Sequence, residues 1–224
     1  MGLEARDLTP GIGTEVTIDA DARLGAGTFA NEVKVGRQNM PRIPYVDESK
    51  LSAEVRAHLG EIPANVTRMM AVASEPVFKG VSAIGSAFIS GSDLPAKLRE
   101  IAILRVGYIS NASYETFQHE ALGRYVGLTD AQIDAVKVGD ASSAALNEVE
   151  SAVLEFVEDL VLNVRAGDAT LAGVRKHLSD AQVVDLILVG GAYMMISRFL
   201  ETTGVELDAD PIDWDAFTKT EAGE

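Results

Sequence analysis

The stretch LPAKLREIAILRVGYISNASYETFQHEALGRYVG, residues 94–127, decides the fold, because it places ionisable side chains where a helical core should be apolar. Its first half is almost solidly apolar, which is typical of a helix buried on most sides. The Asn111-Ala112-Ser113 junction then breaks that helix and supplies an N-cap for a second one. Helices joined so closely pack side by side or at a steep angle. We therefore expect a helix pair at the centre of the protein.

The second helix of this pair carries two polar residues on its inward face. One stripe at helical spacing contains Ala112, Glu115, His119, Leu122 and Val126. Because the stripe ends in leucine and valine, it should face the interior, and Glu115 and His119 should be buried within reach of each other. A buried polar group without a partner costs roughly 2 to 7 kcal/mol, so the two need each other, a third group or a ligand. Glu100 in the first helix is the predicted third group.

Glu115 and His119 suit general acid-base chemistry. Both exchange protons near neutral pH when burial and neighbouring charges shift their pKa values. Different surroundings would then separate a proton donor from an acceptor. The competing hypothesis is a buried network with a purely structural role, and a third possibility is a metal-dependent hydrolase with Glu100 as a further ligand. Most metal sites of that kind use two or three histidines, and no second histidine lies at ligand spacing.

Three other side chains in the stretch 94–127 are candidate substrate ligands. Arg105 could pair with a substrate carboxylate through its planar guanidinium, or form an internal salt bridge to Glu100 or Glu115. Tyr108 and Tyr114 are candidate hydroxyl donors, or core residues whose hydroxyl groups are satisfied internally.

The composition excludes several classes of function. The 224-residue chain has a net charge of -15, which argues against nucleic acid and anionic membranes as partners, because both repel a negative surface. It has no cysteine, so neither thiol catalysis nor a zinc-thiolate site is possible. Hydrophobic residues make up 47% and aromatic residues 6%, which favours helix packing over an aromatic-rich sheet. Without a visible secretory signal or an apolar run of roughly 20 residues, we expect a cytoplasmic protein.

Further helices are predicted on both sides of the central pair. Upstream they cover residues 47–59, 63–72 and 76–90, and downstream capping boxes at Thr129-Asp-Ala-Gln132 and Ser179-Asp-Ala-Gln182 each open a helix. Two more helices cover residues 146–164 and 170–178. Six apolar residues of the upstream helices could form the wall of a ligand pocket: Met69, Met70, Val77, Phe78, Ile84 and Phe88. Helical spacing alone would place the same residues in the core. His58 is expected near a helix C-terminus, where it would interact with the helix dipole.

The last predicted helix, residues 181–203, is apolar almost all round from Leu186 to Ile196. Such a helix must be covered on every face, either by central placement or by another subunit. We therefore predict a homo-oligomer, as a dimer, trimer or hexamer. Tyr193 and Arg198 supply polar tips that could reach a site or only a neighbouring helix.

The run REIAILRVGYISNASYETFQHEALGRYVGLTDAQI, residues 99–133, resembles the core of the carboxymuconolactone decarboxylase and AhpD-like superfamily. The peroxidase branch of that superfamily carries a glutamate, a C-x-x-C pair and a histidine four residues after the second cysteine. Glu100 and His119 match the glutamate and the histidine, while Ala112 and Glu115 stand in the cysteine positions. The chain is therefore similar to the thiol-free, decarboxylase-like branch, and its lack of cysteine excludes thiol peroxidase activity.

The resemblance implies an all-α, AhpD-like helical bundle and a cofactor-free lyase or isomerase acting on a small unsaturated acid or lactone, as in the catabolism of aromatic compounds. In the decarboxylase branch, carbon dioxide leaves a muconolactone and the resulting carbanion equivalent is protonated at carbon. His119 and Glu115 would then transfer the proton, and Glu100 would orient or charge His119. The expected domain organisation is a largely irregular N-terminal arm (1–42), the helical domain (43–208) and an acidic C-terminal tail (209–224).

Overall fold

The computed structural model describes residues 40–214, which lie within one compact unit. All regular structure in these residues is helical, which confirms the all-α prediction. In chain order the elements are η1 (Glu48–Lys50), α1 (Ala53–Glu61), α2 (Asn65–Met70), α3 (Glu75–Ser86), η2 (Ala87–Gly91), α4 (Ala96–Ile109), α5 (Ser113–Tyr125), α6 (Asp130–Val138), α7 (Glu148–Asn163), α8 (Asp168–Val174) and α9 (Asp180–Thr203). Residues 1–39 of the predicted arm and 215–224 of the predicted tail lie outside the described residues.

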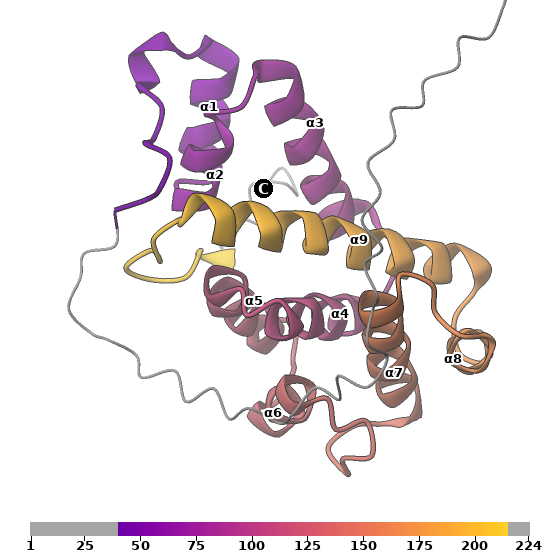
Figure 1. The fold of residues 1–224 in the computed structure, drawn as a ribbon. Coiled ribbons are helices and arrows are strands. Elements are labelled where there is room, and N and C mark those ends of the chain that lie inside the picture. Colours follow the sequence, from indigo (N-terminus) through magenta and orange to yellow (C-terminus); the bar gives the residue numbers. More distant parts are fainter. Residues whose placement is uncertain (1–39, 215–224) are drawn as a thin grey trace, which may run out of the picture. The chain divides into compact units, whose positions relative to one another are not determined.

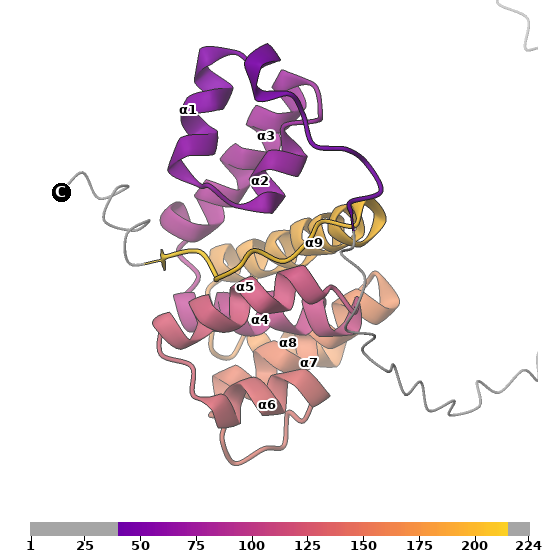
Figure 2. The same ribbon diagram turned by 90° about the vertical axis from the view of Figure 1, so that its left-hand side faces the viewer.

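The predicted helix pair, α4 and α5, lies at the centre of the bundle. Every residue of α4 from Leu98 to Gly107 is buried, because α5, α6, α7 and α9 all pack against it. α9 runs between α1–α3 on one side and α4–α5 on the other (Figures 1 and 2). The main core joins α4 to α6, α7 and α9, and a smaller one joins α1 to α3 through Val55, Leu59 and Phe78.

The junction between α4 and α5 differs in detail from the sequence prediction. Asn111 turns the chain with φ 51, in the left-handed region that asparagine tolerates better than most residues. The N-cap position of α5 is Ala112, which has no side-chain oxygen. The prediction that the Asn111-Ala112-Ser113 junction supplies an N-cap for this helix is therefore wrong. The N–H of Ser113 instead donates to Glu201 of α9, 3.1 Å away. Gly107 lets α5 approach closely, because a Cβ there would lie 3.0 Å from Cγ2 of Thr116.

Side-chain caps explain where the other helices begin. Both predicted capping boxes are present, at Thr129 and Gln132 before α6 and at Ser179 and Gln182 before α9. Upstream, the single helix predicted over residues 47–59 is divided, because Ser52 accepts from the N–H of Val55 and starts α1 there.

Within residues 40–214, α9 is not covered on every face. Leu186, Val189 and Leu200 are buried against the bundle, whereas Leu188 and Met195 are 54% and 44% exposed. By length and composition alone α9 could cross a membrane, and it is the one such helix within residues 40–214. Its packing against α4 and α7 is that of a core helix. Another subunit could pack against this exposed apolar stripe, and the homo-oligomer stays a prediction.

Candidate functional site

The predicted trio of side chains comes together, with a fourth residue added. Nδ1 of His119 lies 2.7 Å from Oε2 of Glu100, and Nε2 of His119 lies 3.2 Å from Oε1 of Glu115. The other oxygen of Glu100 accepts from Nε of Arg99 at 3.0 Å. All four residues are less than 10% exposed. We call this chain of contacts, Arg99–Glu100–His119–Glu115, the charge network.

Two helices and the end of a third build the charge network. α4 supplies Arg99 and Glu100, and α5 supplies Glu115 and His119 one helical turn apart. Arg99 also donates to the main-chain carbonyls of Phe88 and Ile89, at 3.1 and 3.2 Å. Those carbonyls belong to η2, a π-helical turn at the end of α3, where carbonyl groups lack partners within the helix. The guanidinium of Arg99 thus binds Glu100 and two main-chain carbonyls inside the protein.

Surrounding charges set the protonation state of the network. Burial alone would lower the pKa of His119, but the carboxylates of Glu100 and then Glu115 outweigh burial and raise it from 6.5 to about 9. His119 is therefore mainly an imidazolium at neutral pH. The Tyr193 ring stands edge-on to His119, with centroids 5.0 Å apart. Burial and the two nearby carboxylates raise the pKa of Tyr193, so its phenol stays protonated.

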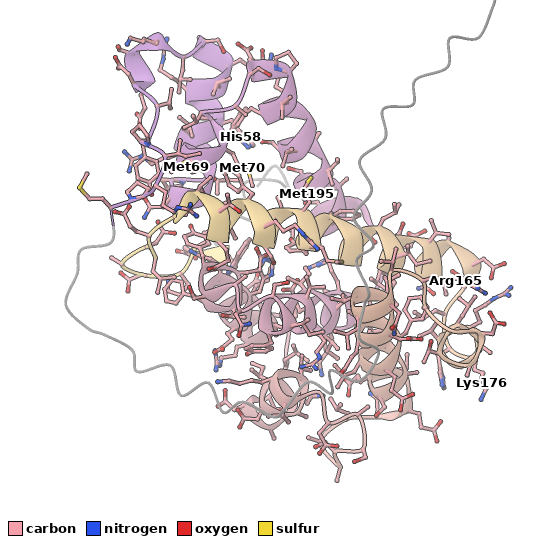
Figure 3. The ribbon with its side chains drawn as sticks, viewed as in Figure 1. His58, Met69, Met70, Arg165, Lys176 and Met195 are labelled. Carbon is pink, nitrogen blue, oxygen red and sulfur yellow. The ribbon has the colours of Figure 1, made fainter. Side chains whose placement is uncertain are left out.

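The charge network opens onto a cavity of about 170 Å³. α1 to α3 form one wall, α5 and α9 form the other, and most of the lining side chains are apolar. Glu115 and His119 face the cavity from α5, and His58, Met70 and Met195, labelled in Figure 3, line it from α1, α2 and α9. Of the six predicted wall residues, Met70, Ile84 and Phe88 line the cavity, Met69 and Phe78 are core, and Val77 is exposed.

The segment after α9, residues 205–214, closes one side of this cavity. It runs back along α5 (Figure 2), and its Ile212 and Trp214 line the cavity. Asp208 fixes it in place by accepting from the hydroxyl of Tyr114, the amide of Gln118 at 2.8 Å and the main-chain N–H of Asn65 at 2.9 Å. We call residues 205–214 the closing segment.

Two of the three predicted substrate ligands lie elsewhere. The guanidinium of Arg105 is 3.0 Å from Glu158 and donates to the carbonyls of Val136 and Lys137, so it binds α6 and α7 rather than the cavity. It does form an internal ion pair, but not with either glutamate of the network. Tyr108 donates to Glu120 at 2.9 Å and does not line the cavity.

Tyr114 does line the cavity, and its hydroxyl is engaged by Asp208. Burial, followed by the hydrogen bond to Asp208, raises the pKa of Tyr114, so its hydroxyl remains a donor at neutral pH. Tyr193, one of the two polar tips predicted on α9, reaches the network. The other, Arg198, donates to the carbonyl of Met194 one turn earlier in the same helix.

The geometry does not favour a metal site made by Glu100, Glu115 and His119. The two carboxylates occupy opposite ring nitrogens of the imidazole, so the three side chains do not converge on one point. Within residues 40–214 no group of three or more His, Asp or Glu side chains is arranged to hold a metal ion.

Sequence reasoning missed three residues that shape the site. Arg99 is visible only as a charge inside an apolar run, and its use as a neutralising partner for Glu100 becomes clear once both are seen buried together. Gln118 and Asp208 have no sequence signal, since their hydrogen bond joins positions 90 residues apart.

The comparisons with known proteins agree with this geometry. The sequence profile of the Carboxymuconolactone decarboxylase family matches residues 75–159, which contain the whole charge network. Over residues 75–159 the chain is therefore similar to the Carboxymuconolactone decarboxylase family. No match was found among curated protein sequences.

Three solved structures have the same fold. An uncharacterized peroxidase-related protein from Ralstonia eutropha JMP134, with an alkylhydroperoxidase AhpD core, has a TM-score of 0.68 at 18% identity, covering 79% of this chain and 94% of its own. A peroxidase-related protein from Silicibacter sp. TM1040 has a TM-score of 0.67 at 17% identity, covering 79% and 96%. A variant of the debrominase Bmp8 in complex with 2,3,4-tribromopyrrole has a TM-score of 0.60 at 11% identity, covering 84% and 98%. At these identities the likeness establishes the AhpD-like helical fold.

Proposed function

We propose that this protein is a cofactor-free lyase or isomerase that moves a proton on a small unsaturated acid or lactone. The observation that carries the proposal is the buried ion pair between Glu115 and His119 at the wall of an apolar cavity. A carboxylate and an imidazolium in one water-poor site provide both a proton acceptor and a proton donor. The similarity of residues 75–159 to the Carboxymuconolactone decarboxylase family supports an enzyme. Catabolism of aromatic compounds in the cytoplasm is part of the proposal.

The three side chains would divide the work as follows. Glu115, ionised beside an imidazolium, accepts the proton from substrate carbon. His119, charged at neutral pH because its pKa is raised to about 9, stabilises the negative charge that develops and returns a proton. Glu100 touches only His119 and Arg99, so it acts as a positioning residue that orients the imidazole and maintains its charge.

Turnover of a panel of unsaturated lactones and acids tests this assignment in Glu115→Gln and His119→Asn variants. Removal of a positioned acid or base lowers turnover by about 100- to 10,000-fold. Full activity in both variants would end the assignment. Glu155→Gln is a matched control, because Glu155 is an exposed glutamate of α7 that does not line the cavity or contact the charge network.

One observation favours a non-catalytic alternative. Each member of the charge network already has an internal partner, which is also the arrangement expected of a structural ion network. Under this alternative, the Glu115→Gln and His119→Asn variants would lower the melting temperature by many degrees, and no substrate would be turned over by the wild type.

A further inference from the structure

The charged groups at the cavity are balanced before any ligand enters. Arg99 and the imidazolium of His119 contribute two positive charges, and Glu100 and Glu115 contribute two negative ones. Both cations are engaged by these carboxylates, and Arg99 also serves two main-chain carbonyls. A ligand carboxylate would therefore add an unpaired charge next to Glu115.

The rest of the described cavity wall offers little to neutralise that charge. Within residues 40–214, its lining includes neither lysine nor arginine. His58 stands on the wall with Nδ1 3.4 Å from a carboxylate oxygen of Glu61. The amide of Gln118 is also committed, since its nitrogen donates to Asp208 and its oxygen accepts from the N–H of Ile212. A buried charge without a partner costs several kcal/mol, so these walls select against anions.

Size and polarity define what the cavity would accept. Its volume of about 170 Å³ is close to the roughly 150 Å³ of an apolar protein cavity that binds benzene, so it fits one ring. Most lining side chains are hydrocarbon, including Val81, Ile84 and Ile196. The second oxygen of Glu115, which has no hydrogen bond or ion pair within the described residues, is left to accept a proton from the ligand. A carbonyl group on the ligand could accept a hydrogen bond from the protonated hydroxyl of Tyr193, which lines the same cavity.

We infer that the substrate is a neutral, single-ring unsaturated lactone or ketone, and that the reaction is a double-bond isomerisation rather than a decarboxylation. The inference rests on the proposed function, whose substrate class it narrows. Glu115 takes a proton from the carbon between the carbonyl group and the double bond. The electron pair of that C–H bond becomes the new double bond, and the pair of the old double bond takes up a proton at the far carbon. Substrate and product contain the same atoms, so no oxidant, reductant or second substrate is needed.

Binding of two isosteric probes tests the substrate class directly. Cyclohex-1-ene-1-carboxamide is neutral, and cyclohex-1-ene-1-carboxylate has the same shape with one negative charge. Calorimetric titration at pH 6, where His119 is protonated, should show the amide binding to wild-type protein at least about tenfold more tightly than the carboxylate, because the latter meets Glu115 at close range. In Glu115→Gln the charge network has a surplus positive charge. The preference for the amide over the carboxylate should therefore shrink or reverse.

A remote charge change is the matched control. Glu155→Gln removes one negative charge on the exposed side of α7, outside the cavity lining, and should leave the preference unchanged. Tighter or equal binding of the carboxylate by wild type overturns the substrate assignment, as does failure of both probes to bind at millimolar concentration. The proposed function is refuted by a different result: full turnover, by both Glu115→Gln and His119→Asn, of whichever substrate is found.

Discussion

Replacing Glu100 by glutamine should lower the pKa of His119 toward neutral pH. Glu100 is fully buried, and its Oε2 lies 2.7 Å from Nδ1 of His119. Its charge is the largest influence that raises the His119 pKa, against the opposing effect of burial. Loss of an opposite charge at this range lowers a pKa by about 1 to 3 units. The pKa of His119 should therefore fall from about 9 to roughly 6 to 8.

Nuclear magnetic resonance titration of the imidazole nitrogens measures this shift. The chain has three histidines, so the His119→Asn spectrum assigns the signal of interest. Glu61→Gln is the control, because Glu61 contacts His58 and should leave the His119 titration unchanged. An unaltered His119 pKa in Glu100→Gln would refute the reasoning, since it would mean that the 2.7 Å ion pair does not charge the imidazole.

The same ion pairs make stability depend on pH. Because the folded-state pKa of His119 is above its unfolded value of 6.5, its contribution to stability is fully present below pH 6.5 and is lost as pH rises through about 9. The difference between the folded and unfolded pKa values of His119 corresponds to about 3 kcal/mol in the free energy of unfolding. Urea denaturation of wild type and His119→Asn across pH 6 to 10 should show the two free energies of unfolding converging at high pH. A constant difference between them would contradict the ion-pair account.

Three further outcomes are expected. Asp208→Ala should release the closing segment, so that fluorescence of the single tryptophan shifts to the red and the free energy of unfolding falls by about 2 to 4 kcal/mol, because charge-assisted hydrogen bonds are lost. Gly139→Ala should cost about 1 to 3 kcal/mol in thermal unfolding, because φ is 74 and the new Cβ would lie 2.6 Å from the buried guanidinium of Arg105. Light scattering should show a homo-oligomer that Leu188→Glu, in the exposed stripe of α9, dissociates.

Each of these three predictions has a control or an outcome that would contradict it. An unchanged emission maximum in Asp208→Ala would mean that other contacts hold the closing segment. Gly173→Ala is the control for Gly139→Ala, because Gly173 is helical with open space around it, and alanine there should be neutral or stabilising. A wild-type chain that scatters light as a monomer at micromolar concentration would refute the oligomer.

Sequence reasoning succeeded where the signal is local. The caps at Thr129 and Ser179 and the end of α9 at Gly204 depend on residues within one helical turn, and the structure confirms them. The pairing of Glu115 with His119 was also predictable, because a spacing of four residues places two side chains on one face of a helix.

The failures involve partners from distant parts of the chain. Arg105 was expected to bind a substrate carboxylate or to pair with Glu100 or Glu115, but helix packing brings Glu158 of α7 against it. The closing segment was equally hidden, since only the folded chain places Asp208 beside Gln118. What covers the exposed stripe of α9 is hidden for a related reason: hydropathy shows that a face is apolar, and does not show what packs against it.

The central claim is that Glu115 and His119 move a proton within the cavity, and solvent-isotope incorporation tests it most directly. Unsaturated single-ring lactones and ketones would be incubated in deuterated buffer with wild type, Glu115→Gln or Glu155→Gln, and their masses measured. Wild type and Glu155→Gln should place deuterium on ring carbon of at least one compound, and Glu115→Gln should do so about 100-fold more slowly or not at all. Equal deuterium uptake with Glu115→Gln and wild type would contradict the account.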